Sequence, residues 1–115
     1  MDSFSVASQR DGQIHRLTPV GELDIATTPM LVHAFEEATQ GDAAKIVVDL
    51  TQLAFMDSTA IHLLLQWSDA CADSDRLRIV NGSPAVVRIL DITGVRESLP
   101  IISSADDPLA PLPSG

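Results

Sequence analysis

The spacing of hydrophobic residues changes repeatedly along the chain, and each spacing is typical of a different element. Short β-branched runs predict strands, whereas apolar residues three and four positions apart predict helices. The predicted strands are 3–8, 13–20, 45–50, 77–80 and a short edge strand at 100–102. The run at 45–50 is continuous and apolar, as expected of a central strand that is covered on both faces.

Capping and turn residues mark the limits of three predicted helices. The first lies between a Thr27 or Thr28 cap and Gly41, the second covers 60–72, and the third runs from a Ser83 cap to Gly94. Asp57, Ser58 and Thr59 are three consecutive capping residues before the second helix. Residues 51–56 are predicted to be a connection, with Leu53 and Phe55 packed inward.

The resulting order is β-β-α-β-α-β-α, followed by the short edge strand. Strands that alternate with helices imply right-handed crossovers and a mostly parallel sheet, beside an antiparallel hairpin formed by the first two strands. We therefore predict an α/β fold with a four- to five-stranded sheet and three, or at most four, helices in one domain at 1–103. Residues 104–115 are rich in proline and are predicted to be a frayed tail.

Composition narrows the classes of function. The 115 residues are 45% hydrophobic, which is enough to bury one core. Seven Lys and Arg against 16 Asp and Glu give a net charge of −9, which argues against nucleic acid and against an anionic membrane surface as partners. The single cysteine, Cys71, permits neither an internal disulfide nor a Cys-based zinc site. With no signal-peptide or membrane-span pattern, we expect a cytoplasmic protein.

Two acidic segments are expected to meet where the parallel strands end. Residues 21–24 follow the second predicted strand and 57–59 follow the third, and functional groups in such sheets gather at this edge. Ser58 stands at or beside a helix N-terminus, where unpaired N–H groups and the helix dipole would stabilise a phosphate on its oxygen. The spacing is also explained if these polar residues serve only as helix caps.

Catalytic and metal-binding interpretations find little support. Ser58 has no Gly-x-Ser-x-Gly elbow, and the three histidines lie on separate elements without ligand spacing, with His33 and His62 predicted on helix surfaces or boundaries. The strand that ends near Asp49 resembles the phosphoacceptor strand of a response-regulator receiver, but the acidic pair and the late lysine of such a site are missing. It also resembles the nucleophile loop of haloacid-dehalogenase-type phosphatases, but Thr51 replaces the second Asp. We predict no enzyme activity, no metal and no cofactor.

The segments at residues 21–29, 46–61 and 91–101 together resemble one family, the STAS domain, which is found in anti-sigma factor antagonists and at the cytoplasmic ends of sulphate transporters. Residues 21–29, Gly-Glu-Leu-Asp-Ile-Ala-Thr-Thr-Pro, are similar to the family's Gly-Glu-Leu-Asp loop and first helix. Residues 46–61 are similar to its central strand and phosphorylation loop, and 91–101 to its third helix and following turn. The resemblance covers roughly residues 4–102 and includes the strand order.

The resemblance implies a bacterial partner-switching protein. In the antagonist branch, the unphosphorylated form binds an anti-sigma factor with Ser/Thr kinase activity and so frees a sigma factor. Phosphorylation of the motif serine, here Ser58, separates the complex, and a PP2C-type phosphatase restores the active form. By motif position, the partner-binding residues would be Glu22, Asp24, Asp57, Ser58 and Thr59. The alternative is a STAS module without phosphorylation that serves as a structural subunit, for example of a lipid-transport complex.

Two departures from the family pattern predict altered partner choice. Ala60 stands where the family usually has glycine, and its methyl group is expected to narrow the access of a kinase loop. The family usually ends in an amphipathic fourth helix, whereas this chain continues as Ala-Asp-Asp-Pro with further prolines from residue 105. A fourth helix is therefore expected to be short or absent.

Overall fold

A computed structural model describes residues 4–103, and its elements follow the predicted order with one additional strand. The strands are β1 (Ser5–Asp11), β2 (Ile14–Leu23), β3 (Lys45–Asp49), β4 (Leu53–Met56), β5 (Leu77–Val80) and β6 (Ile101–Ile102). The helices are α1 (Thr28–Gln40), α2 (Ser58–Ala70) and α3 (Pro84–Thr93), followed by a 3₁₀ turn, η1 (Arg96–Ser98). The predicted tail at 104–115 lies outside the described residues.

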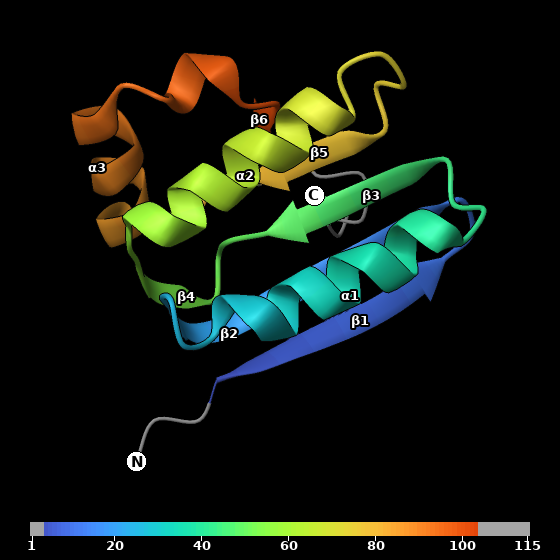
Figure 1. Cartoon of the computed structure of the whole chain (residues 1–115), viewed down its shortest axis with the longest axis horizontal. Helices are drawn as coiled ribbons and strands as arrows, with labels where there is room; N and C mark the ends of the chain where they lie inside the picture. Colours follow the sequence, from blue (N-terminus) through green and yellow to red (C-terminus); the bar gives the residue numbers. More distant parts are fainter. Residues whose placement is uncertain (1–3, 104–115) are drawn as a thin grey trace, which may run out of the picture.

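The sheet confirms the predicted α/β class. Its strand order is β1-β2-β3-β5-β6, and β4 pairs with β2 off this path (Figure 1). Only β1 and β2 are antiparallel, and Gly12 with φ +59° lies in the turn between them, as a glycine can without strain. All other pairs are parallel. We call the edge where β2, β3 and β5 end the carboxyl edge, and the edge where β3 and β5 begin the amino edge.

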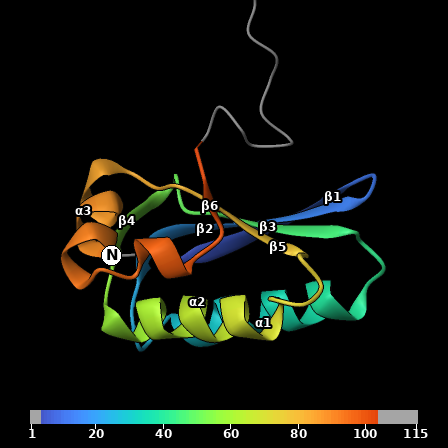
Figure 2. The same ribbon diagram turned by 90° about the horizontal axis from the view of Figure 1, so that it is seen from above.

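Helices α1 and α2 lie side by side on one face of the sheet, with their first residues at the carboxyl edge (Figure 1, Figure 2). The rings of Phe35 and Trp67 stack between them, with centroids 3.9 Å apart and planes 10° from parallel. The apolar stripes of both helices pack on the strands, and the fully buried core includes Leu17, Leu31, Ile46, Val48 and Leu64. Within residues 4–103, no helix has the length and hydrophobicity that a membrane crossing requires.

The predicted connection after β3 contains the strand β4. Leu53 is buried as predicted, but Phe55 is 43% exposed, so the expected inward packing of Phe55 is wrong. The register of β4 on β2 shifts by one residue, because Leu53 lies opposite Gly21 whereas Phe55 lies opposite Glu22. This irregularity interrupts the alternation of buried and exposed positions, and both Ala54 and Phe55 face solvent.

Helix α3 is docked on the segment that leads into α2. Ser83 precedes α3, but its hydroxyl group makes no cap and instead donates a hydrogen bond to the carbonyl oxygen of Leu53 at 3.1 Å. Gly82 permits the close approach, because a Cβ there would lie 2.8 Å from the Val86 side chain and 2.9 Å from the carbonyl oxygen of Leu50. The start of α3 thus supports β4 from the side.

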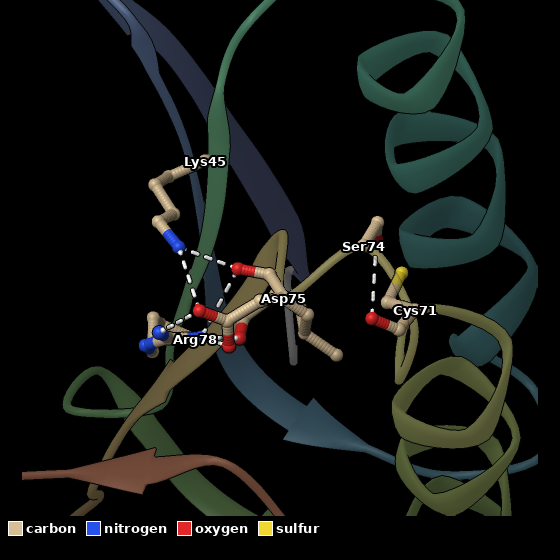
Figure 3. Close-up of polar contacts among 6 residues, drawn as sticks. Lys45, Cys71, Ser74, Asp75 and Arg78 are labelled. Carbon is tan, nitrogen blue, oxygen red and sulfur yellow. Dashed lines mark hydrogen bonds and ion pairs between the residues drawn. The ribbon is translucent and has the colours of Figure 1, made fainter.

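At the amino edge, charged side chains close the turn before β5. Figure 3 shows Lys45 and Arg78 directed at Asp75, which has a left-handed backbone with φ +53°. Arg78 pairs with the Asp75 carboxylate at 2.9 Å, and the Lys45 ammonium group lies 3.4 Å from it and also donates to the Asp75 carbonyl oxygen. Hydrogen bonds from Arg78 and Lys45 hold the pKa of Asp75 below its usual value.

Arg76 ties the end of α1 to the same turn. Its guanidinium group donates three hydrogen bonds of 2.8–3.0 Å to the carbonyl oxygens of Thr39, Gly41 and Ala43. Arg10 pairs with Asp42 in the same loop at 2.9 Å. The groups that accept these bonds are three backbone carbonyls and one loop carboxylate, which would otherwise depend on water.

Candidate functional site

The loop after β2 and the segment that enters α2 meet at the carboxyl edge. Glu22 and Leu23 pair in parallel with Phe55 and Met56. The N–H of Asp57 donates a hydrogen bond to the carbonyl oxygen of Leu23 at 3.1 Å. The two acidic segments therefore lie next to each other, as expected from the topology, and the start of α2 is fixed to the end of β2.

Asp57 caps α2, and Ser58 is the first residue of the helix rather than lying before it. The carboxylate of Asp57 accepts a hydrogen bond from the N–H of Ala60 at 3.1 Å. Within residues 4–103, no hydrogen bond engages the N–H groups of Ser58 and Thr59. Both residues are exposed. The first turn of α2 thus offers two unpaired donors beside an accessible hydroxyl group, an arrangement that favours an anion on Ser58.

Asp24 shapes the loop that lies beside this turn. Its carboxylate accepts hydrogen bonds from the N–H groups of Ala26 at 2.9 Å and Thr27 at 3.1 Å. The hydroxyl of Thr27 donates to the carbonyl oxygen of Glu22 at 2.8 Å and makes no cap of its own on α1. Asp24, and not the predicted threonine, therefore satisfies the donors before α1, while the Glu22 side chain is exposed.

A groove of about 470 Å³ lies between α1 and α2 and includes Ser58. Its lining residues are Ser58, Thr59, His62, Leu63 and Gln66 from α2, and Thr28 and Val32 from α1. Ser58, His62 and Gln66 are four residues apart in turn, which places them on one face of α2. The exposed position of His62 agrees with its predicted place on a helix surface or boundary, and the groove lining includes both His62 and Ser58.

Large apolar side chains are exposed on the segments that converge here. Ile25 in the loop after β2 is 74% exposed, Met30 in the first turn of α1 is 49% exposed, and Phe55 on β4 is 43% exposed. A single exposed apolar residue is ordinary, but several on converging segments favour a protein-binding surface. Sequence analysis missed these residues, although Met30 already stands outside the buried stripe of α1.

Ala60 does not lie on this surface. It is fully buried and belongs to the core beneath α2. The expectation that its methyl group narrows access to Ser58 is therefore wrong, because the methyl group packs inside the protein and not toward an approaching partner. The substitution of alanine for the family's glycine instead favours the helical backbone by about 1 kcal/mol.

The carboxylate of Asp49, at the end of β3, anchors the turn into β4. It pairs with Arg16 at 2.7 Å and accepts hydrogen bonds from the N–H of Thr51 at 2.9 Å and its hydroxyl at 2.6 Å. Asp49 is only 6% exposed. A buried carboxylate held from three sides is poorly placed to act as the phosphoacceptor that its strand resembles, and its role here is to fix the turn.

Comparisons with known proteins agree with this geometry. The family model of the STAS domain matches residues 5–107. The anti-sigma-B factor antagonist of Staphylococcus aureus (strain NCTC 8325 / PS 47) is 30% identical over 96 residues, which cover 83% of this chain and 89% of that protein. An anti-sigma factor antagonist from Mycobacterium paratuberculosis has a similar structure, with a TM-score of 0.77 at 21% identity over 86% of this chain and 85% of that one. The phosphorylated form of SpoIIAA, a Bacillus cell fate determinant, gives a TM-score of 0.62 at 20% identity over 88% and 90%.

Proposed function

The chain belongs to the STAS domain family, and from this premise we propose that it is an anti-sigma factor antagonist that works by partner switching. Its unphosphorylated form binds an anti-sigma factor with Ser/Thr kinase activity and so releases a sigma factor. Phosphorylation of Ser58 by that kinase ends the complex, and a PP2C-type phosphatase restores it. The chain itself acts as a cytoplasmic binding protein and not as a catalyst.

The observation that carries this proposal is the position of Ser58. Its exposed side chain stands on the first turn of α2, beside the N–H groups of Ser58 and Thr59, which have no partner in the described part of the chain. The named relatives are antagonists of anti-sigma factors, and SpoIIAA exists in a phosphorylated form. Exposed Ile25, Met30 and Phe55 supply apolar area for a protein partner on the adjoining segments.

Phosphorylation would alter the surface more than the fold. The Ser58 hydroxyl oxygen bonds to the γ-phosphorus of ATP, the bond to ADP breaks, and the hydroxyl proton passes to a base of the kinase. The new group carries about −1.5 to −2 charges and meets backbone donors that favour an anion. The cost falls on the partner, which would have to cover this charge beside Asp57 and Asp24.

The alternative of an unmodified structural subunit makes a different prediction at Ser58. Affinity capture from a native lysate, using wild type, Ser58→Ala and Ser58→Asp, distinguishes the two. Ser74→Asp is the matched control, because Ser74 is an exposed serine at the amino edge. We expect wild type, Ser58→Ala and Ser74→Asp to retain a protein identified by mass spectrometry as an ATP-dependent kinase, and Ser58→Asp to lose it.

Incubation of the captured complex with ATP completes the test. Peptide mapping should place the phosphate on Ser58, and Ser58→Ala should remain unmodified. Phosphate at full level in Ser58→Ala would contradict the assignment of Ser58 as the modified residue. Capture of the same partners by all four proteins, with no phosphate on any, would support the structural subunit instead.

A further inference from the structure

His62 is the one histidine of the described chain whose ring has no partner. Within residues 4–103, no hydrogen bond or ion pair engages its imidazole. By contrast, His33 lies 2.9 Å from the Glu37 carboxylate, and His15 lies 2.7 Å from the Ser8 hydroxyl. His62 is exposed and lines the groove one helical turn after Ser58. Residues four apart on a helix have Cβ atoms roughly 5–6 Å apart, within reach of a phosphoryl group on serine.

We propose that the imidazole of His62 binds the phosphoryl group of phosphorylated Ser58 across one turn of α2. The inference rests on the proposed function, since it concerns the same modified side chain. A phosphoserine has three acceptor oxygens, and a protonated imidazole can donate a charge-assisted hydrogen bond to one of them. The phosphoryl group is then held between the unpaired N–H groups of the first turn and the ring of His62.

No other group in the groove competes for this pairing. The remaining lining residues carry no titratable side chain: Thr28, Val32, Thr59, Leu63 and Gln66. The carboxylate of Asp57, the nearest acid in sequence, already accepts the N–H of Ala60. The next carboxylates on the same helix faces are Glu36, four residues after Val32 on α1, and Asp69, seven residues after His62 on α2. A phosphate on Ser58 is therefore the strongest negative charge one turn from His62.

The pairing has a measurable consequence for the phosphate. The second ionisation of phosphoserine has a pKa of about 6, so the charge of the phosphate changes in an accessible pH range. A cation beside the phosphate favours its dianionic form and so lowers the second pKa of the phosphate. His62 thus acts as a positioning residue, and its effect is confined to the phosphorylated form.

Phosphorus NMR on protein with genetically encoded phosphoserine at position 58 tests this without any kinase. We expect the midpoint of the phosphate titration to be lower in wild type than in His62→Gln by roughly 0.3–0.7 pH unit, from a helical ion pair with a doubly charged partner. His62→Lys, which keeps a positive charge, should retain the low midpoint. His33→Gln is the matched control on α1 and should leave the midpoint unchanged.

Equal midpoints in wild type and His62→Gln would overturn the inference. A midpoint in His62→Lys as high as in His62→Gln would overturn it too, because the charge would then not reach the phosphate. Melting temperatures of the four proteins exclude unfolding as the cause of any shift. The failure of a kinase to modify Ser58 would contradict the proposed function alone, because the phosphoserine in this titration is installed independently.

Discussion

The two edges of the sheet differ in the accessible polar groups that they leave without partners among the described residues. At the amino edge, Arg76 bonds three backbone carbonyls, and Lys45 and Arg78 share Asp75. At the carboxyl edge, the first turn of α2 keeps donors that have no partner within residues 4–103, next to the exposed hydroxyl of Ser58. The charged groups of the amino edge thus pair with one another, whereas the carboxyl edge presents accessible donors and a hydroxyl group.

This difference indicates that the two edges of the sheet have different roles. Paired charges at the amino edge join the end of α1 to the turn before β5, so they contribute to the stability of the fold. Open donors and exposed apolar side chains at the carboxyl edge contribute little to stability and are typical of a binding surface. Substitutions at the two edges should therefore affect different measurements.

Among substitutions of charged residues, the largest effect on stability is expected from Arg76→Met. The substitution keeps most of the aliphatic stem but removes the hydrogen bonds to Thr39, Gly41 and Ala43, so the free energy of unfolding should fall by about 2–3 kcal/mol. Urea denaturation measures this, and partner affinity of the folded variant should stay as in wild type. Arg88→Met, at an exposed position on α3, is the control and should cost less than about 0.5 kcal/mol. Equal losses in both variants would refute the role of the amino edge.

Phe55→Thr should show the opposite behaviour. Because Phe55 is 43% exposed, its loss should change the unfolding free energy by about 0.5 kcal/mol or less, yet weaken partner binding roughly tenfold. Leu53→Ala on the same strand is the informative comparison, since this buried side chain should cost about 2–5 kcal/mol of stability. If Phe55→Thr destabilised the fold and left the partner affinity measured by titration calorimetry unchanged, Phe55 would belong to the core and not to the binding surface.

The smallest expected effect is the pH dependence of the melting temperature that Asp75 confers. The pKa of Asp75 is lowered by its hydrogen bonds to Arg78 and Lys45, so its contribution to stability is present above the unfolded value near 3.8 and is lost as the pH falls through the lower folded value. Asp75→Asn, which tolerates the left-handed backbone, should melt slightly below wild type at pH 7 and at the same temperature as wild type in strong acid. A difference that persisted unchanged in acid would show that the charge of Asp75 is irrelevant. Asp73→Asn serves as the control in the same exposed turn.

Local patterns in the sequence were sufficient for most of the fold. The continuous apolar run of β3 and the capping residue Asp57 at the start of α2 depend only on near neighbours, and both elements were predicted close to their observed places. The strand β4 was missed because it exists only through its pairing with β2. The exposure of Phe55 follows from a shift in that same register, which no local pattern encodes.

The candidate site was predictable to a similar extent. Parallel topology predicts that the two acidic segments meet. The capping pattern and the family resemblance identify Ser58 as the candidate phosphorylation site. The hydrogen bonds of Asp24 to its own loop could not be inferred, because a threonine cap has the same sequence signature. Helical spacing alone predicts that His62 lies near Ser58. That the His62 ring lines an accessible groove could be seen only from the packing of α1 against α2.

Titration calorimetry of the isolated anti-sigma factor with unmodified protein and with protein carrying phosphoserine at 58 tests the central claim most directly. The phosphoprotein should bind about 30- to several-thousand-fold more weakly, since an unpaired charge buried at an interface costs about 2–5 kcal/mol. Its melting temperature should stay within about 2 °C of the unmodified protein, because the phosphate meets helix donors that favour it. Equal affinity of the two forms, or a loss of binding that occurs only because the phosphoprotein has unfolded, would contradict the account.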